Sequence, residues 1–239
     1  MWWFAALHAN LLLLYRRAGG ATGPRPLLDA GSGTGGLLAR IAAEYPLQNA
    51  FGLDADAEAC ARAAAKSRRP VCAGSVNALP FADAAFGAIF SADVLCHAGV
   101  DERAALAQFH RCLGDEGVLV LSLPAYRWMM SRHDLAVSNV RRYTRSGVAG
   151  LLQATGFRVV FAGYWNMLLF PLMVLTRKLL PDGGAPVSDV KPYPAPVEAV
   201  CRAATAIERI PLRWGVSLPF GGSVVAVAAK PAAGVGNST

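Results

Sequence analysis

The sequence predicts an α/β fold in which a doubly wound, parallel sheet carries helices on both faces. Short apolar runs of strand length alternate with segments whose apolar residues recur at helical spacing, as expected of β-α-β units. The run at 86–91 is almost continuously apolar, as in strands buried on both faces of a parallel sheet. A glycine-rich stretch follows the first predicted strand, where such sheets bind ligands. The 239 residues suffice for one such domain.

A helix is predicted at 2–17, ahead of the first strand. Its apolar residues recur on one stripe, formed by Trp3, Leu7, Leu11 and Leu14. We therefore treat residues 1–20 as an N-terminal helix that packs on the domain or over its site.

Four strands and three helices are predicted in the first half of the domain. The strands span 26–30, 49–54, 70–73 and 86–91, and the helices span 37–45, 57–66 and 102–113. Pro46 ends the first of these helices, because a proline disfavours helical conformation in the residue before it. Asp56 and Asp101 precede the other two at the N-cap position. On the last helix we expect Arg111 to point outward, and we expect Gly114 to end the helix.

Three more strands and two insertions are predicted in the second half of the domain. The strands span 118–123, 157–163 and 223–229, and the helices span 145–155 and 197–209. The domain is taken as 21–230, with insertions at 124–144 and 164–196 and a disordered tail at 231–239.

The apolar segment 164–180 is too short and too interrupted to be a membrane span, because it contains Asn166 and Pro171. Its basic end fits a lid or a helix at a membrane surface. The stretch 181–196 is rich in proline and glycine and is predicted to be a loop.

The glycine-rich stretch has the composition of a cofactor cradle. Gly31, Gly33 and Gly35 let the main chain turn tightly and approach a bulky ligand, with Ser32 between them. Free N–H groups at the start of the next helix face that ligand.

The second strand ends in an acid, Asp54, which is followed by Ala55. It lies 23 positions beyond Gly31, where a carboxylate can accept hydrogen bonds from both hydroxyls of a ribose. The two features predict a cofactor that contains adenosine.

The identity of that cofactor depends on Asp29, because the glycines also satisfy a dinucleotide pattern. A carboxylate two residues before the first glycine repels a pyrophosphate, but it can bind the ammonium of a methionine moiety. The stretch resembles motif I of class I S-adenosylmethionine (SAM) methyltransferases, an acid followed by G-x-G-x-G. The resemblance implies SAM as the cofactor, and an NAD-linked oxidoreductase is the enzyme alternative.

Two further segments extend the resemblance to residues 25–125. Residues 79–86, LPFADAAF, and 93–97, DVLCH, resemble the ubiquinone and menaquinone C-methylase-like (type 11) methyltransferases. The resemblance implies a Rossmann-like methyltransferase fold with a mostly parallel seven-stranded sheet and an antiparallel last strand. It also implies that Ser75 and Val76 flank the adenine, although the family commonly has Asp at the position of Ser75, and that Ser91 lies in the cofactor site.

Candidate catalytic residues follow the fourth and fifth predicted strands. His97 lies just past the fourth strand and could act as a general base, or it could be a loop histidine. His133 and Asp134 could form a base and its orienting acid, and Tyr143 lies in the same insertion.

The insertion 124–144 and its flanks resemble a bacterial subgroup of these methyltransferases. Shared elements are the S-x-H-D and R-R-Y-T sequences here, the N-terminal W-W-F and the stretch that begins at Tyr164. Five arginines against one aspartate across 124–145 suit a carboxylate or phosphate on the acceptor, or else form a solvated face.

The composition limits the remaining function classes. A net charge of +7 permits anionic partners, and the apolar fraction of 54% suggests apolar surface for a partner or membrane. No N/D-P-P-Y/F element is present and the basic residues are not interleaved with aromatic residues, so we expect no nucleic-acid partner. The five cysteines are scattered and the four histidines lack metal-ligand spacing, which predicts reduced thiols and no metal.

The sequence thus predicts a SAM-dependent methyltransferase that acts on a small-molecule or lipid-like acceptor, with an anionic acceptor permitted. The first 15 residues lack a basic region and a cleavage site ahead of the domain, which predicts a cytoplasmic protein. Peripheral contact through 164–180 would place it at the inner face of the membrane. A catalytically silent SAM-binding or membrane-associated subunit is the alternative from a different class.

Overall fold

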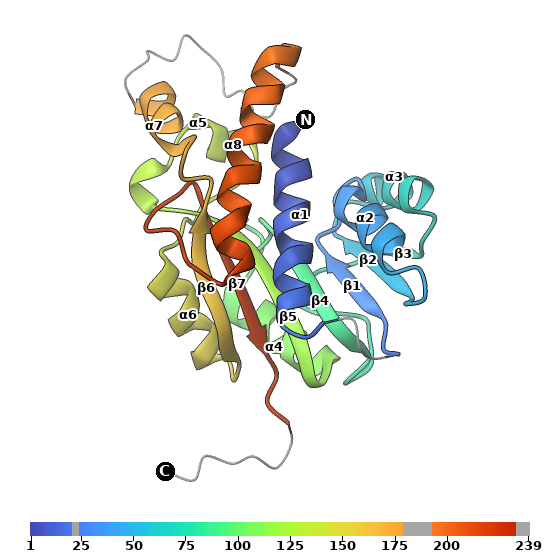
Figure 1. Cartoon of the computed structure of the whole chain (residues 1–239). Coiled ribbons are helices and arrows are strands. Elements are labelled where there is room, and N and C mark those ends of the chain that lie inside the picture. The colour runs from blue at the N-terminus through green and yellow to red at the C-terminus, as the bar shows by residue number, and fades with distance from the viewer. Residues whose placement is uncertain (21–23, 179–192, 233–239) are drawn as a thin grey trace, which may run out of the picture.

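The computed structural model describes residues 1–20, 24–178 and 193–232, which form one seven-stranded sheet flanked by helices (Figure 1). The strand order is β3-β2-β1-β4-β5-β7-β6. The first five strands in this order pair in parallel, and β7 pairs antiparallel with both β5 and β6. The predicted fold class, including the antiparallel last strand, is confirmed.

All seven predicted strands are present. Their bounds are β1 Leu27–Ala30, β2 Ala50–Asp54, β3 Val71–Ala73, β4 Phe86–Ala92, β5 Leu113–Pro124, β6 Arg158–Trp165 and β7 Ser223–Ala229. The prediction that Gly114 ends the preceding helix was wrong, because that helix ends at Cys112 and Gly114 already belongs to β5. Leu113 pairs with Phe86 of the neighbouring strand, so sheet pairing begins one residue after the helix.

The helices also follow the predicted order. They are α1 Trp2–Arg17, α2 Gly36–Glu44, α3 Ala57–Ser67, α4 Glu102–Cys112, α5 Arg132–Ala136, α6 Arg145–Ala154, α7 Phe170–Lys178 and α8 Ala195–Arg213, with a 3-10 turn at Arg127–Met129. Asp56 and Asp101 cap α3 and α4 as predicted, since their carboxylates accept hydrogen bonds from the main chain of the first helical turn. Most of the predicted loop 181–196 and of the predicted tail 231–239 lies outside the described residues.

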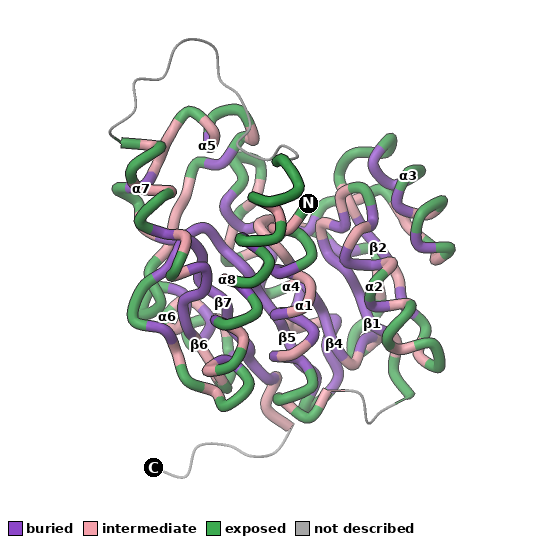
Figure 2. Tube along the Cα trace, turned by 45° about the horizontal axis from the view of Figure 1, so that its top comes forward, coloured by how far each residue is buried: buried purple, intermediate pink, exposed green. Residues whose placement is uncertain are grey.

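Side chains of the central strands alternate between two buried clusters, one on each face of the sheet. Leu28, Ile89 and Leu119 pack with α4 and α6 on one face, whereas Leu27 and Phe90 pack with α1, α2 and α8 on the other. Figure 2 shows these strands buried between the exposed outer sides of the helices. The packing fixes the strand register, and it brings the carboxyl ends of β3, β2, β1 and β4 to one edge of the sheet.

Three negative findings apply to the described part of the chain. No helix there combines the length and apolar character needed to cross a membrane. No group of three or more histidine, cysteine or acidic side chains gathers there as in a metal site. All five cysteines are free thiols, and four of them are buried.

Candidate functional site

The turn between β1 and α2 has an unusual main-chain conformation. Gly31, Gly33 and Gly35 have φ angles of +85°, +49° and +77°, which residues with side chains rarely adopt. A Cβ at Gly31 would lie 2.1 Å from Val94 Cγ2, and one at Gly35 would lie 2.6 Å from Ala63 Cα. A Cβ at Gly33 would meet nothing within 4 Å, so this glycine faces open space. The turn is therefore packed against the protein on two sides and accessible to a ligand at its centre.

Asp54 lies at the end of β2 and faces this turn. Its carboxylate accepts hydrogen bonds from the main-chain N–H of Gly33 at 2.7 Å and of Asp56 at 3.0 Å. A carboxylate has about four acceptor positions, so each oxygen can accept one more donor. The acid is thus held at the edge of the turn with capacity for ligand hydroxyls.

Asp29 is buried in β1, with 1% of its surface exposed. Burial raises its pKa to about 7, and the Asp54 carboxylate contributes to the rise, whereas the main-chain N–H of Leu38 opposes it. Its Oδ2 atom has no hydrogen-bond partner among the described residues. A buried carboxyl group in this state favours a cationic ligand, because a positive charge nearby would stabilise its ionised form.

Two buried hydroxyl groups on neighbouring segments also lack a hydrogen-bond partner. Ser32 Oγ in the glycine turn and Ser91 Oγ in β4 are both without a partner among the described residues. Unpaired buried polar atoms are rare in folded proteins, and these two, together with Asp29 Oδ2, belong to the strands and the turn at one edge of the sheet, which makes this edge the candidate site for a polar ligand.

The remaining predicted cofactor residues lie at the ends of adjacent strands. Ala55 follows β2 and is exposed, while Ser75 and the buried Val76 follow β3. Ser75 Oγ accepts a hydrogen bond from the N–H of Asn77 at 3.2 Å. All ten predicted residues thus belong to the ends of four neighbouring parallel strands, β3, β2, β1 and β4, or to the turns that follow them.

Asp93 is a candidate residue that the sequence analysis missed. It directly follows β4 with φ +56°, and its carboxylate accepts a hydrogen bond from Ser122 Oγ of β5 at 3.4 Å. Burial raises its pKa to about 7, although Ser122 and Arg142 oppose the rise. The available signal was an acid directly after a buried strand, the feature that drew attention to Asp54.

His97 lies near the same edge on an exposed loop. Its pKa is lowered, chiefly by partial burial, although nearby Asp54 opposes the shift. Its main chain forms a bridge with Asn139, which joins this loop to the insertion 124–144. A neutral imidazole at this place can accept a proton or a hydrogen bond.

Asp134 has a structural role in the insertion, which argues against its predicted function as the orienting acid of His133. Its side chain is fully buried and forms an ion pair with Arg142, whose side chain is 3% exposed. Ser131 also donates to the carboxylate from its main-chain N–H and its hydroxyl. Burial alone would raise the pKa of Asp134, but Arg142 and these hydrogen bonds outweigh it and the pKa lies below the ordinary value.

Tyr143 and Arg141 likewise hold the insertion to the loop after β4. Tyr143 Oη donates to Leu95 O at 3.0 Å, and burial, together with Glu102, raises the pKa of this phenol. Arg141 donates to the carbonyls of Leu95 and His97. Both arginines of the R-R-Y-T sequence are therefore engaged by the protein itself, which leaves less positive charge for an acceptor than the sequence suggested.

An aromatic cluster gathers where the insertions meet. Tyr126 stacks on Tyr164 with ring centroids 5.2 Å apart, and it lies 5.8 Å from Trp128 and 5.6 Å from Phe170. Phe220 extends the cluster, 5.9 Å from Phe170. These rings come from both predicted insertions and from the loop before β7, so they form an apolar wall that no single segment provides.

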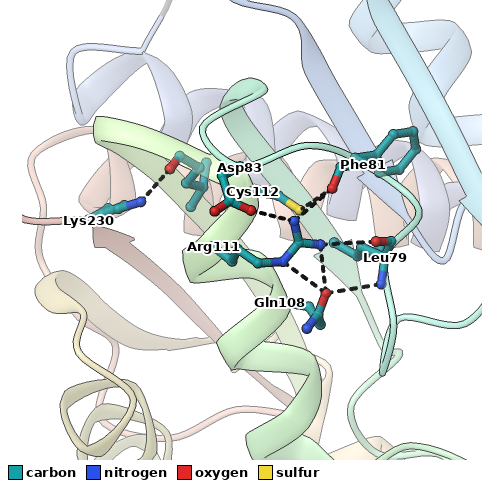
Figure 3. A network of polar contacts seen from close by, with 8 residues as sticks. Leu79, Phe81, Asp83, Gln108, Arg111, Cys112 and Lys230 are labelled. Atoms are coloured by element: carbon teal, nitrogen blue, oxygen red, sulfur yellow. Dashed lines mark hydrogen bonds and ion pairs between the residues drawn. The ribbon is translucent and has the colours of Figure 1, made fainter.

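The LPFAD segment is held by Arg111, contrary to the prediction that this side chain points outward. Figure 3 shows its guanidinium turned from α4 toward the segment. It donates to Leu79 O at 3.0 Å, to Phe81 O at 2.7 Å and to Asp83 Oδ1 at 2.7 Å. The carbonyls of Leu79 and Phe81 need hydrogen-bond donors, and this need turns the Arg111 side chain inward.

The first half of α1 lies close to the glycine turn. A Cβ added at Gly36 would be 3.1 Å from His8 Cε1, so His8 of α1 contacts the start of α2. Burial, followed by the positive charges of Arg40 and Lys66, lowers the pKa of His8 to about 4. The N-terminal helix therefore borders the turn on the side of α2.

Comparison with known proteins indicates which protein family this chain resembles. Residues 28–121 match the type 11 family model, described as a methyltransferase domain. No curated protein matches the chain in sequence.

Solved structures show the same fold across nearly the whole chain. A candidate sarcosine dimethylglycine methyltransferase from Galdieria sulphuraria is 13% identical, with a TM-score of 0.63 over 94% of this chain and 86% of that one. Geranyl diphosphate C-methyltransferase from Streptomyces coelicolor A3(2), in complex with Mg2+, geranyl diphosphate and S-adenosylhomocysteine, is 14% identical, with a TM-score of 0.61 over 93% and 77%. The cyclase SpnF is 18% identical, with a TM-score of 0.62 over 94% and 81%.

Residues 28–121 are thus matched to a methyltransferase domain, and the chain shares its fold with solved methyltransferases, in agreement with the resemblance of the sequence to class I SAM-dependent methyltransferases. The matched domain indicates SAM-dependent methyltransferase activity with SAM as the cofactor. One protein of the same fold, 15% identical, was solved with SAM. The buried acid with an unpaired oxygen, the accessible glycine and the acid at the end of β2 fit this positively charged nucleoside.

Proposed function

We propose that this chain transfers the methyl group of SAM to a small-molecule or lipid-like acceptor, with an anionic acceptor permitted. The observation that carries the proposal is Asp29, a buried carboxyl group with an unpaired oxygen beside an accessible glycine turn. Asp29 would bind the ammonium of the methionine moiety, and Asp54 would accept the ribose hydroxyls. Ser75 and Val76 would flank the adenine, with Gly31, Ser32, Gly33, Gly35, Ala55 and Ser91 completing the cradle.

SAM supplies a methyl group that its sulfonium charge already activates, so positioning of the acceptor accounts for much of the rate. Asp93 would take a proton from the acceptor, because it lies at the ends of β4 and β5 and its pKa of about 7 suits a general base. His97 is a second candidate on the following loop. His133 and Tyr143 remain predicted contacts from the insertion, and Asp134 serves to position it.

The acceptor would lie against the aromatic cluster of Tyr126, Trp128, Tyr164, Phe170 and Phe220. These rings favour an apolar body over a nucleobase paired in a duplex, in keeping with the absence of an N/D-P-P-Y/F element. An acceptor with an apolar body and a polar reacting end would satisfy both the rings and Asp93.

The function can be tested with SAM labelled in its methyl group. We expect the purified chain to transfer label to a component of a small-molecule or lipid extract, and mass spectrometry would identify the product. Tight SAM binding without transfer to any fraction would instead support the silent SAM-binding subunit.

Replacing Asp54 with alanine should weaken SAM binding by about 1.5–3 kcal/mol, or roughly tenfold to 150-fold, the scale of hydrogen bonds to a charged group. Calorimetry with SAM measures this loss. Asp115→Ala removes an exposed carboxylate from the opposite end of the sheet and should leave the affinity unchanged. Equal affinities in the two variants would refute the role of Asp54.

Replacing Asp93 with asparagine should reduce the transfer rate and abolish its pH dependence. A base must be unprotonated to act, so the wild-type rate should rise as the pH increases through about 7 and then level off. Initial rates across this range, measured at saturating SAM with the acceptor found above, test the role, because saturation removes the effect of pH on SAM binding. A rate that retains the same pH profile in Asp93→Asn would assign the proton transfer to another group.

We further propose a cytoplasmic location with peripheral contact at the inner face of the membrane through 164–180. Exposed Leu168, Leu172 and Leu175 support this contact, and the basic residues Arg177 and Lys178 follow them. A short apolar surface with a basic end suits the boundary of an anionic bilayer.

A further inference from the structure

A cavity of about 210 Å3 lies between α1, α2 and α8. No residue predicted to hold SAM lines it. Helices α1 and α8 run side by side (Figure 1), and they are joined by hydrogen bonds from Trp2 N to Glu198 Oε2 and from Arg209 Nε to Asn10 Oδ1, both 2.8 Å. The α1 wall consists of Trp2 and three alanines, whose short side chains leave the space open.

Three arginines line this cavity, Arg40 from α2 and Arg202 and Arg209 from α8. Arg202 lies 3.4 Å from the carboxylate of Glu198, one turn earlier in the same helix. Neither Arg40 nor Arg209 forms an ion pair with any carboxylate of the described residues. The cavity therefore has a surplus of positive charge and room for a ligand.

The surroundings of Arg209 disfavour its positive charge. Burial lowers the pKa of Arg209, and the positive charges of Arg213 and Arg40 lower it further. Asn10, only 2% exposed, holds the Nε edge of the Arg209 guanidinium and fixes its plane. A guanidinium oriented by a buried amide, beside two further arginines, is suited to bind a phosphoryl group through paired hydrogen bonds.

We propose that this cavity binds a phosphoryl group at a site separate from the methyl-transfer site. The group could belong to a soluble phosphate compound or to the headgroup of an anionic lipid. The outer face of α8 is relevant to the second source, because on the side of the helix turned away from the cavity it exposes a stripe of apolar residues at helical spacing. The stripe consists of Val197, Val200, Ile207, Ile210 and Trp214.

Calorimetry with pyrophosphate tests the site directly. Wild-type protein should bind it, and the double variant Arg40→Gln/Arg209→Gln should bind at least tenfold more weakly. Arg103→Gln removes the same charge from an exposed position on α4 and should bind as wild type. If the double variant does not fold, Arg40→Gln alone serves, since Arg40 is exposed. Absent binding to wild type, or undiminished binding to the variant, overturns the proposal.

Two further measurements distinguish a soluble phosphate compound from a lipid headgroup, and this cavity from the SAM site. Sedimentation with phosphatidylglycerol vesicles that is clearly weaker in the double variant than in wild type would support the site and identify a lipid headgroup, and any remaining binding is that expected of 164–180. Pyrophosphate binding that is lost in the double variant, with equal vesicle binding by the two proteins, would support a soluble ligand. SAM affinity should be equal in wild type and double variant, so a failure of this site and a failure of the methyltransferase proposal are distinguishable.

Discussion

Replacing Arg142 with methionine should lower the free energy of unfolding by about 3–5 kcal/mol, because it leaves the Asp134 carboxylate buried without its counter-charge. The guanidinium donates to both carboxylate oxygens, at 2.9 Å and 3.0 Å, and also to Ala125 O at 2.9 Å. Methionine fills a similar volume but supplies none of these donors. Chemical denaturation of wild type and variant measures the loss.

Arg158→Met is the matched control, since it breaks an exposed ion pair with Glu116 in which both side chains are more than half exposed. Such pairs contribute about 0–1 kcal/mol, so this variant should unfold almost as wild type does. Replacing both buried partners, as in Asp134→Leu/Arg142→Met, should recover part of the loss because no unpaired charge remains. Similar losses in the two arginine variants would contradict the structural role of Asp134.

The affinity for SAM should fall as the pH decreases below about 7, by up to tenfold per pH unit, and it should level off above that value. Asp29 has a raised pKa in the free protein, so it is mostly protonated in acid, whereas binding of a cation requires its ionised form. The proton must leave before the ligand binds, and this requirement weakens binding at low pH. Calorimetric titrations from about pH 5.5 to 8 measure the effect.

The variant Asp29→Asn tests whether the pH dependence of SAM binding arises from Asp29 or from another carboxyl group near the site. The variant should bind SAM weakly and with little pH dependence, because its amide stays neutral at every pH. S-adenosylhomocysteine keeps the ammonium but lacks the sulfonium charge, so it should retain the wild-type pH profile if Asp29 binds the ammonium. Identical profiles in wild type and Asp29→Asn would refute the role of this acid.

Most of the fold could be predicted because its signals are local. The apolar run at 86–91, the caps at Asp56 and Asp101 and the stripe on α1 each reflect interactions within a few residues, and the structure confirms all of them. Gly114 shows the limit of such signals. A glycine after a helix indicates an end of the helix, but pairing of Leu113 with Phe86, far apart in sequence, decided which residue begins the strand.

The candidate site also contains residues that local sequence signals predicted and residues whose role depends on tertiary contacts. The placement of the glycines, Asp29 and Asp54 around one turn was predicted from their spacing, since the turn and the strand ends impose that spacing on the chain, and their role in binding SAM stays a prediction. Asp93 was missed because its raised pKa depends on burial beside Ser122 of the neighbouring strand. Asp134 was predicted to orient His133 because the two residues are neighbours in sequence. Its ion pair with Arg142, eight residues later, forms only in the folded insertion.

The order of strands and helices, the glycine turn and the acids at its edge were determined by the sequence itself, because each depends on conformational preferences of short segments. Which charged groups face a ligand and which hold the protein together was decided only by the tertiary structure. Arg111, Arg141 and Arg142 bind carbonyls and a carboxylate of other segments, whereas Arg40 and Arg209 converge on a cavity. The physical reason is that the partner of a long charged side chain is fixed by packing between distant segments, which no local pattern encodes.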